Sequence, residues 1–259
     1  MSVRDYHDMS ALVTGGTGGI GFEIAAQLAE AGVPRVTING RNDDRGQAAL
    51  ESLRARVPDC QFYFVQADPR AYDAASAMVS QAVKKMGALD LLVSSIPGHL
   101  SPQPFHLVPP DAFDEQIQSH FSSVINTCHA ALPHLMARQG GTIINIASDA
   151  AKIATPGEAL QGALKAAVVM FTRTLALEAS RSGIRAHAIT PSIVRNTSAY
   201  HRVMASDFSQ RLFSKAEAKA KLGVAEPGDI APLAVFLAGP GASKMTGQAI
   251  SVNGGISAA

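Results

Sequence analysis

The stretch Thr14-Gly15-Gly16-Thr17-Gly18-Gly19-Ile20-Gly21 decides the fold, because it joins an apolar run at residues 10–14 to a helical repeat at residues 22–31. Glycine has no side chain, so a backbone of this composition can approach a pyrophosphate closely. The start of the next helix offers free N–H groups and a positive dipole end to the same anion. Because the glycines follow a strand and open a helix near the N-terminus, they predict nucleotide binding and not an ordinary turn.

Short β-rich runs alternate with longer helical patterns from one end of the chain to the other. The expected strands are residues 10–14, 35–39, 61–66, 89–94, 141–147, 184–190 and 248–252. The expected helices are residues 22–31, 43–56, 71–86, 110–137, 158–180, 208–221 and 229–238. This alternation, with no linker, predicts one α/β domain over residues 1–259: a Rossmann-like, doubly wound parallel sheet of about seven strands with helices on both faces.

Composition narrows the class of protein. The 259 residues are 47% hydrophobic and 17% charged, so they can bury a large core, and a formal net charge of +1 gives no electrostatic reason to expect nucleic acid or a membrane surface. Cys60 and Cys128 match no metal-ligand spacing and fit a reducing compartment. The sequence has neither a secretory signal nor a run of about 18 apolar residues. We therefore expect a cytoplasmic protein that holds no metal and acts on a small molecule.

The glycine pattern Thr-Gly-x-x-x-Gly-x-Gly resembles that of the short-chain dehydrogenase/reductase family, and the resemblance extends over nearly the whole chain. Asp68 is similar to the aspartate that contacts adenine in that family, and Asn145 to the strand asparagine that supports the active site. Residues 226–231 and 246–255 are similar to its C-terminal signature. The resemblance implies a nicotinamide-dependent oxidoreductase. The cofactor contacts that it implies are Thr14, Gly15, Thr17, Gly19, Ile20, Gly21, Arg41, Asp68, Lys165 and Ile193.

The end of the second strand bears on the choice of nicotinamide. An acid there would bind the adenosine ribose of NAD and repel a 2′-phosphate, but this chain has Gly40 followed by Arg41. An arginine can clamp the 2′-phosphate with its fork of donors. The second basic residue that some NADP-binding members carry inside the glycine loop is absent, since Gly18 stands there. We therefore expect NADP(H), with NAD(H) possible and with a solvated surface arginine as the alternative.

The resemblance also implies a catalytic set in which a serine, a tyrosine, a lysine and a helix asparagine cooperate. Ser148 matches the serine, with a helix or turn cap as its alternative role, and Lys165 matches the lysine that holds the nicotinamide ribose. Thirteen residues after Ser148, at the tyrosine position, the chain has Gln161. His120 stands at the asparagine position. A carboxamide donates hydrogen bonds but does not exchange a proton in a useful pH range.

These departures gather at the nicotinamide end, since residues 94–97 and 191–192 also differ from the family pattern. An altered site needs another acid or base. His120 is the first candidate because imidazole titrates near neutrality, although it can equally fill the lost asparagine's space. His99 is a second candidate or a surface residue. Tyr200 and His201 lie in residues 193–223, a segment that forms a mobile lid over the substrate in the resembled family.

Two hypotheses of function follow. In the first, the protein is a nicotinamide-dependent oxidoreductase of a secondary alcohol or carbonyl, or of a ring cis-dihydrodiol, whose oxidation gains aromaticity and tolerates a weak proton path. In the second, it is a catalytically silent nucleotide-binding homologue that acts as a regulatory or scaffold subunit. A lyase or hydrolase on the same scaffold also stays open. The small residues at 162, 163, 166 and 167 would allow close helix packing, and the resemblance implies a dimer or tetramer.

Overall fold

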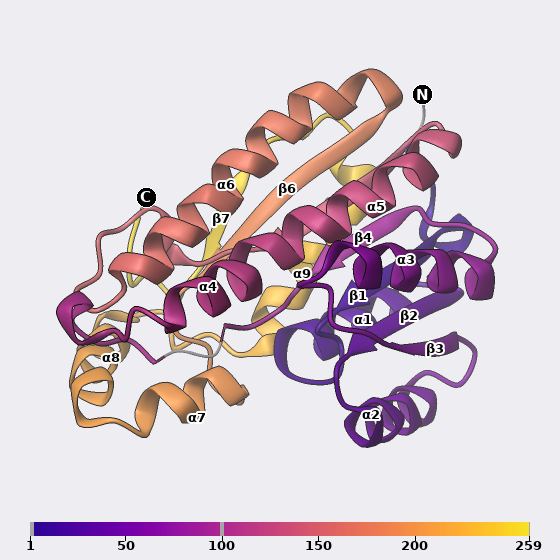
Figure 1. Ribbon diagram of the computed structural model, residues 1–259. Coiled ribbons are helices and arrows are strands. Elements are labelled where there is room, and N and C mark those ends of the chain that lie inside the picture. Colours follow the sequence, from indigo (N-terminus) through magenta and orange to yellow (C-terminus); the bar gives the residue numbers. More distant parts are fainter. Residues whose placement is uncertain (1–2, 99–100, 259) are drawn as a thin grey trace.

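Seven apolar runs form one parallel sheet in the computed structural model, which describes residues 3–98 and 101–258 (Figure 1). The strands are β1 (Ser10–Thr14), β2 (Arg35–Gly40), β3 (Gln61–Gln66), β4 (Leu91–Ser94), β5 (Gly141–Ile146), β6 (Ile184–Pro191) and β7 (Ala249–Val252). Their order across the sheet is β3-β2-β1-β4-β5-β6-β7. The order reverses direction between β1 and β4, and in open α/β sheets such a point is where ligands bind. The predicted fold class is confirmed.

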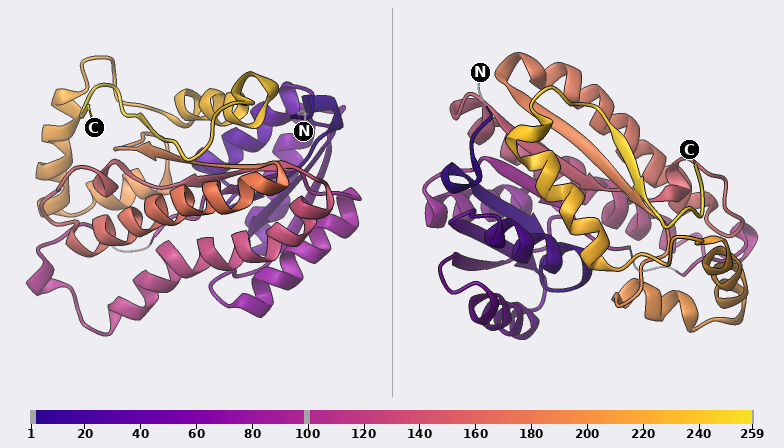
Figure 2. Two further views of the ribbon diagram at one scale, coloured as in Figure 1. Left: turned by 90° about the horizontal axis from the view of Figure 1, so that it is seen from above. Right: turned by 180° about the vertical axis from the view of Figure 1, so that it is seen from behind.

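The strands are mostly apolar because helices cover both faces of the sheet. On one face lie α1 (Gly19–Glu30), α2 (Asp43–Arg56) and α9 (Pro227–Ala238), and on the other lie α3 (Tyr72–Met86), α5 (Ser123–Ala137) and α6 (Ala159–Ala179) (Figure 2). Each layer encloses its own hydrophobic cluster against the sheet. β1, β4 and β6 are buried over their full length, whereas the edge strands β3 and β7 are only partly covered.

The long helix expected over residues 110–137 is divided. It consists of α4 (Ala112–Ile117), a π-helical turn at Gln118–Ser122 and α5. Within this region the Ser123 hydroxyl donates to the carbonyl oxygen of Ser119 at 2.7 Å. A π-turn adds one residue without disturbing the apolar pattern on either side, so periodicity alone does not reveal it. Such turns occur frequently at functional sites, and this one contains His120.

α6 is the longest helix of the described chain. Among the described residues, Ala159–Ser182 is the one helical segment long and apolar enough to cross a membrane by length and composition. In this fold it is a core helix that packs along β6, and its own residues Val168, Leu175 and Ala176 are buried. Its apolar character is therefore explained by the sheet that it covers.

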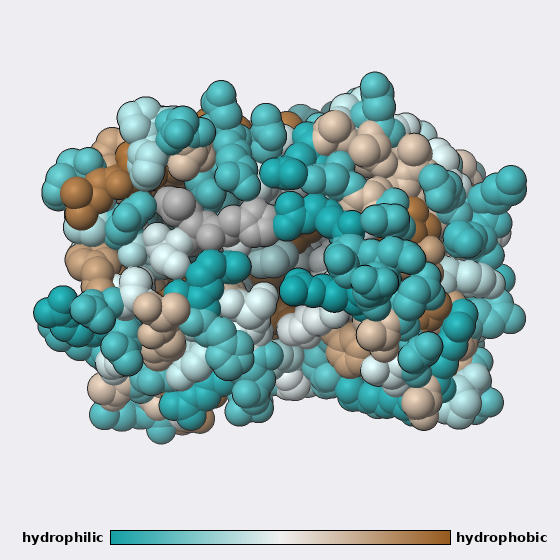
Figure 3. Space-filling model, turned by 60° about the horizontal axis from the view of Figure 1, so that its bottom comes forward, coloured by the Kyte–Doolittle hydropathy of each residue, from teal (hydrophilic) through white to brown (hydrophobic). Residues whose placement is uncertain are grey.

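The segment between β6 and α9 forms two helices at the end of the sheet where β6 finishes, namely α7 (Ser198–Met204) and α8 (Asp207–Lys219) (Figure 1). The sequence predicted only the second. The Thr197 hydroxyl accepts from the N–H of Tyr200 and so caps α7. α7 is too short for its amphipathic pattern to be visible, and its cap was the only local signal. The face on this side of the molecule is hollowed near its centre (Figure 3).

Candidate active site and cofactor cleft

The glycine loop after β1 is packed so tightly that two of its positions exclude any side chain. Gly15 has φ +63°, and a Cβ added to it would overlap the carbonyl oxygen of Ser95 in the loop after β4. A Cβ on Gly21 would lie 2.5 Å from the carbonyl oxygen of Gly15. Thr14 is buried at the end of β1 and holds the loop after β4, since its hydroxyl accepts from the N–H of Ser95 at 3.3 Å. The backbone at the start of α1 is therefore left open to an incoming anion.

The same loop also meets the segment that follows β6. Gly19 has φ +54°, and its Cβ position faces the side chain of Thr197 at 3.3 Å. Ile20 follows on the first turn of α1 and is partly buried, whereas Ile193 is buried just after β6. The glycine loop thus lies against the segment that follows β6, at the switch point between β1 and β4.

Gly40 at the end of β2 has no side chain, and Thr17 lies beside the position that a Cβ would take. A Cβ on Gly40 would lie 2.5 Å from the methyl group of Thr17. Arg41 is exposed beside it, and its carbonyl oxygen accepts from the side-chain amide of Gln66 at 3.0 Å. The guanidinium of Arg41 lies near enough to Asp68 to act on it electrostatically. The end of β2 therefore carries an arginine and no acid, and this arginine lies near the carboxylate of Asp68.

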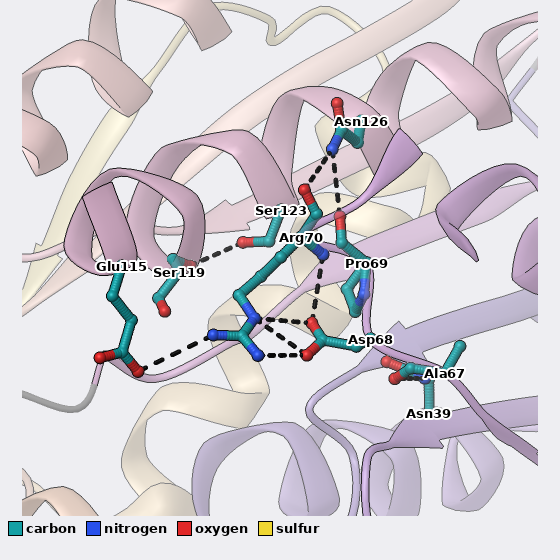
Figure 4. Close-up of polar contacts among 9 residues, drawn as sticks. All are labelled: Asn39, Ala67, Asp68, Pro69, Arg70, Glu115, Ser119, Ser123 and Asn126. Atoms are coloured by element: carbon teal, nitrogen blue, oxygen red, sulfur yellow. Dashed lines mark hydrogen bonds and ion pairs between the residues drawn. The ribbon is translucent and has the colours of Figure 1, made fainter. Parts of the chain in front are cut away.

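Asp68 is held by an arginine that the sequence analysis did not single out (Figure 4). Arg70 Nε donates to both carboxylate oxygens of Asp68 at 3.0 and 2.9 Å, and its guanidinium reaches Glu115 on α4 at 3.8 Å. Burial opposes the ionisation of Asp68, but the bonds and charge of Arg70 outweigh it and lower the pKa of this carboxyl. Asn126 donates to the carbonyl oxygens of Pro69 and Arg70, which fixes the turn. Any adenine contact of Asp68 would be shared with Arg70.

Ser148 stands just after β5, in extended conformation. Its Oγ accepts from the N–H of Ala150 at 3.2 Å, so it caps the 3₁₀ turn η4 (Asp149–Ala151). Ser148 therefore has the capping role that the sequence allowed. The cap uses the hydroxyl oxygen as an acceptor, so the hydroxyl proton of Ser148 can still be donated to another group. Three residues earlier, within β5, Asn145 donates from Nδ2 to Thr172 on α6 at 2.9 Å, which ties the strand end to that helix.

Lys165 reaches the same strand end from α6. Its Nζ donates to the carbonyl oxygen of Ile146 at 3.2 Å, and the residue is only 6% exposed. Burial lowers the pKa of its ammonium group to about 8. Lys165 thus bonds to β5 two residues before Ser148, so the two residues lie at the same strand end although they come from different elements.

His120 lies in the π-turn and is 2% exposed. Its ring lies against the backbone of Gly98, where any Cβ would overlap it. This position brings the histidine to the loop after β4, on the sheet face that α6 covers. His99, the second histidine considered from the sequence, lies outside the described residues.

The comparisons with known proteins agree with this geometry. A family model described as enoyl-(acyl carrier protein) reductase matches residues 15–257. The 3-oxoacyl-[acyl-carrier-protein] reductase FabG of Staphylococcus aureus is 30% identical over 247 residues, which cover 95% of this chain and 97% of that protein. The chain belongs to the short-chain dehydrogenase/reductase family.

Solved structures of this family show the same architecture. The 3-ketoacyl-(acyl-carrier-protein) reductase of Brucella melitensis, complexed with NADH, is 29% identical with a TM-score of 0.86, and the match covers 97% of this chain and 99% of that one. A gluconate 5-dehydrogenase of Burkholderia cenocepacia, in complex with NADP and tartrate, is 26% identical with a TM-score of 0.87, and 98% of each chain is covered. The first of these two structures contains NADH and the second contains NADP. None of these three proteins is named for a ring dihydrodiol.

In this short-chain dehydrogenase/reductase, Gln161 lies on the first turn of α6, one turn before Lys165. It is partly buried and borders a small pocket under the loop that follows residue 100. Gln116 of α4 and Ser101 line the same pocket. The polar groups around residue 161 therefore include carboxamides and a hydroxyl, which donate and accept hydrogen bonds but do not titrate near neutrality.

Tyr200 of α7 is engaged within its own segment. Its hydroxyl donates to Glu217 of α8 at 3.2 Å, and Arg195 binds the same carboxylate oxygen at 3.2 Å. This arrangement does not favour Tyr200 as a substitute for an active-site tyrosine, and the exposed His201 only meets the ring of Tyr200. The residue of α7 that reaches inwards is Arg202, whose Nη2 donates to the carbonyl oxygen of Gly98 at 2.8 Å.

Glu158 immediately precedes α6 and is 8% exposed, and nothing in the sequence distinguishes it from a surface acid. Its side chain makes no capping bond to the helix. Burial raises the pKa of Glu158 to about 7, a hydrogen bond with Thr155 opposes the increase, and the charge of Asp149 adds to it. The sequence shows an acid three residues before position 161, but it does not show that this acid is buried.

Proposed function

We propose that this protein is an NADP(H)-dependent oxidoreductase that interconverts a carbonyl and a secondary alcohol. The observation that carries the proposal is the meeting of Ser148 and Lys165 at the end of β5, next to a glycine loop without room for side chains. Family members named as 3-oxoacyl reductases favour a substrate with a 3-oxo group, such as a 3-oxoacyl thioester. A ring cis-dihydrodiol is the alternative substrate class.

The residues fit a dinucleotide. Gly15 and Gly21 let the loop pack tightly, and Gly18, whose Cβ position has no neighbour within 4 Å, leaves the backbone open just before α1, where free N–H groups would bind a pyrophosphate. Arg41 would clamp a 2′-phosphate, since Thr17 fills the space that an acid at residue 40 would need. Asp68 would contact adenine, Ile193 would border the nicotinamide, and Lys165 would hold the ribose. The bound nicotinamide supplies or accepts the hydride.

At the reacting carbon, Ser148 and Gln161 would both donate hydrogen bonds to the substrate oxygen. Such donors stabilise the negative charge that develops on that oxygen during hydride transfer. Neither group releases a proton near neutral pH, so the proton has to come from a different residue. His120 is one candidate, from its place in the π-turn beside the loop after β4.

The segment of residues 193–223 would act as a lid over the substrate. Thr197 touches the glycine loop and Arg202 bonds to the loop after β4, so α7 spans the two loops that border the cleft. Ordering such a segment on substrate binding excludes water from the site.

We also propose a cytoplasmic homo-oligomer, either a dimer or a tetramer. Met170 and Leu177 are 59% and 74% exposed on α6 and lie seven residues apart, so they share one face of the helix. Buried and free thiols at Cys60 and Cys128 are in keeping with a reducing compartment. A monomer in light scattering would contradict the oligomer.

A second function is favoured by Gln161 itself. If no other group supplies the proton, the protein is a nucleotide-binding subunit without redox activity. The test follows nicotinamide absorbance for the wild type and for Gln161→Tyr, with NADPH and NADH, against 3-oxoacyl thioesters, simple ketones, secondary alcohols and ring cis-diols. We expect turnover by the wild type. A silent wild type beside an active Gln161→Tyr variant would instead support the subunit.

A further inference from the structure

Two carboxyl groups flank the strand end at which Ser148 and Lys165 meet. Asp149 directly follows Ser148 and is 5% exposed. Glu158 directly precedes α6 and lies one helical turn before Gln161. The first turn of α6 packs on η4, since a Cβ on Gly162 would lie 3.0 Å from the carbonyl oxygen of Ala150. The two acids are therefore brought to the same corner of the site by the elements that carry the candidate catalytic residues.

The two carboxyl groups have different surroundings. Asp149 accepts hydrogen bonds from Ser251 at 3.3 Å, from Asn253 at 3.2 Å and from Ser257 at 2.5 Å. Ser251 in turn accepts from Lys152 at 2.6 Å, so a cation backs this network. Three donors and a nearby ammonium group therefore surround this carboxylate.

Glu158 has no such support. It is almost fully buried, and the groups that act on its carboxyl are the Thr155 side chain and the charge of Asp149. A buried acid beside a charged carboxylate is held in its protonated form, because ionisation would place two like charges together in a poorly solvated site. A pair of acids whose environments differ in this way is the arrangement by which enzymes separate a proton donor from a fixed charge.

We propose that Glu158 is the general acid of this site, and that it protonates the substrate oxygen directly or through one water; the assignment rests on the proposed oxidoreductase function. In reduction, hydride adds to the carbonyl carbon and the π electrons of the C=O bond move to oxygen. That oxygen takes the carboxyl proton of Glu158, which becomes a carboxylate and regains a proton from solvent before the next turnover. In oxidation the carboxylate removes the hydroxyl proton. Gln161 then orients the oxygen and does not transfer the proton.

The test compares the pH dependence of kcat for ketone or 3-oxoacyl thioester reduction in four proteins. The wild type should lose activity as pH rises through about 7, because Glu158 then loses the proton that it donates. Glu158→Gln should lower kcat by about 10²–10⁴-fold and abolish this loss of activity at high pH, while the Kd of NADPH stays unchanged. Glu158→Asp should restore part of the activity. Glu51→Gln, which alters an exposed carboxylate on α2, is the control for loss of an acid.

Several results would overturn the proposal. If Glu158→Gln keeps the wild-type kcat and still loses activity as pH rises, another residue supplies the proton. A loss of activity in His120→Asn would then identify His120 as that residue. If Glu158→Gln does not fold, a Glu158→Asp variant with an unshifted profile overturns it equally. If the wild type transfers no hydride to any substrate, the proposed oxidoreductase function is wrong, and so is the role of Glu158 as its proton donor. Infrared spectra of wild type and Glu158→Asp then still show whether a protonated carboxyl titrates near pH 7.

Discussion

Residues 158 and 161 stand one helical turn apart and offer different chemistry to a substrate oxygen. Gln161 donates a hydrogen bond and keeps its proton, whereas a carboxylic acid at 158 can release one. A single tyrosine hydroxyl would do both. Separating the two tasks between neighbouring side chains would leave Lys165 to hold a ribose, in keeping with the buried position of its ammonium group at Ile146.

Replacing Glu158 by glutamine should change how the stability of the protein depends on pH. The pKa of Glu158 is raised on folding, so its contribution is fully present below the ordinary value of a glutamate and is lost as pH rises through about 7. At pH 8, Glu158→Gln should therefore be more stable than the wild type, by on the order of 2–3 kcal/mol. At pH 4 the two should be nearly equal.

Urea unfolding at both pH values measures this difference. The control is Glu51→Gln, an exposed position at which no such divergence is expected. Parallel pH profiles for wild type and Glu158→Gln would show that Glu158 is not held protonated by the fold.

At the adenosine end, Gly40→Asp should weaken the binding of NADP more than that of NAD. An added carboxylate repels the 2′-phosphate, which NAD lacks, so the loss of affinity for NADP should exceed the loss for NAD by about tenfold or more. Because Thr17 fills this space, Gly40→Ala is the matched control for crowding without charge. Fluorescence titration gives both Kd values. Equal losses for NAD and NADP in both variants would contradict an NADP-specific site.

The site residues that the sequence could predict are those defined by linear spacing. The glycine loop, Ser148 and Lys165 follow from the distances between motifs, which the fold preserves. Arg70 and Glu158 could not be predicted, because their importance comes from a neighbour or from burial. Arg202 could not be predicted either, because its hydrogen-bond acceptor, Gly98, lies 104 residues away in the sequence.

At the scale of elements, apolar runs between glycines predicted the strands closely, because buried parallel strands tolerate little polarity. The π-turn at Gln118–Ser122 and the seven-residue α7 were not predicted. The π-turn is a single turn inside a longer apolar helical repeat, and a two-turn helix is too short to show a repeat of its own. Both elements border the cleft, so the sequence was least informative where the site departs from regular structure.

Arg202→Ala should loosen α7 from the loop after β4. The bond from Arg202 to Gly98 is charge-assisted, and losing it should raise KM for the substrate by about tenfold while the Kd of NADPH stays unchanged. Residues 193–223 should also be cut faster by chymotrypsin. Arg211→Ala is the control, since Arg211 is an exposed arginine of α8. Unchanged KM and cleavage rate in Arg202→Ala would mean that this bond does not hold the segment closed.

The whole molecule keeps the frame of a short-chain dehydrogenase/reductase, with its seven-stranded sheet, a switch point between β1 and β4 and a glycine loop. Solved relatives of the same fold are in complex with NADH or with NADP. A frame of this kind positions a cofactor whether or not chemistry follows, so binding alone does not distinguish an oxidoreductase from a silent subunit.

Hydride transfer distinguishes them most directly. Wild-type protein, mixed at pH 6 with stoichiometric NADPH and an excess of a short 3-oxoacyl thioester or ketone, should oxidise the bound NADPH completely in a single turnover, and the product should carry deuterium when the nicotinamide is deuterated. NADPH that binds to the protein but stays reduced in the presence of every carbonyl substrate, under conditions in which Gln161→Tyr oxidises it, would contradict the oxidoreductase.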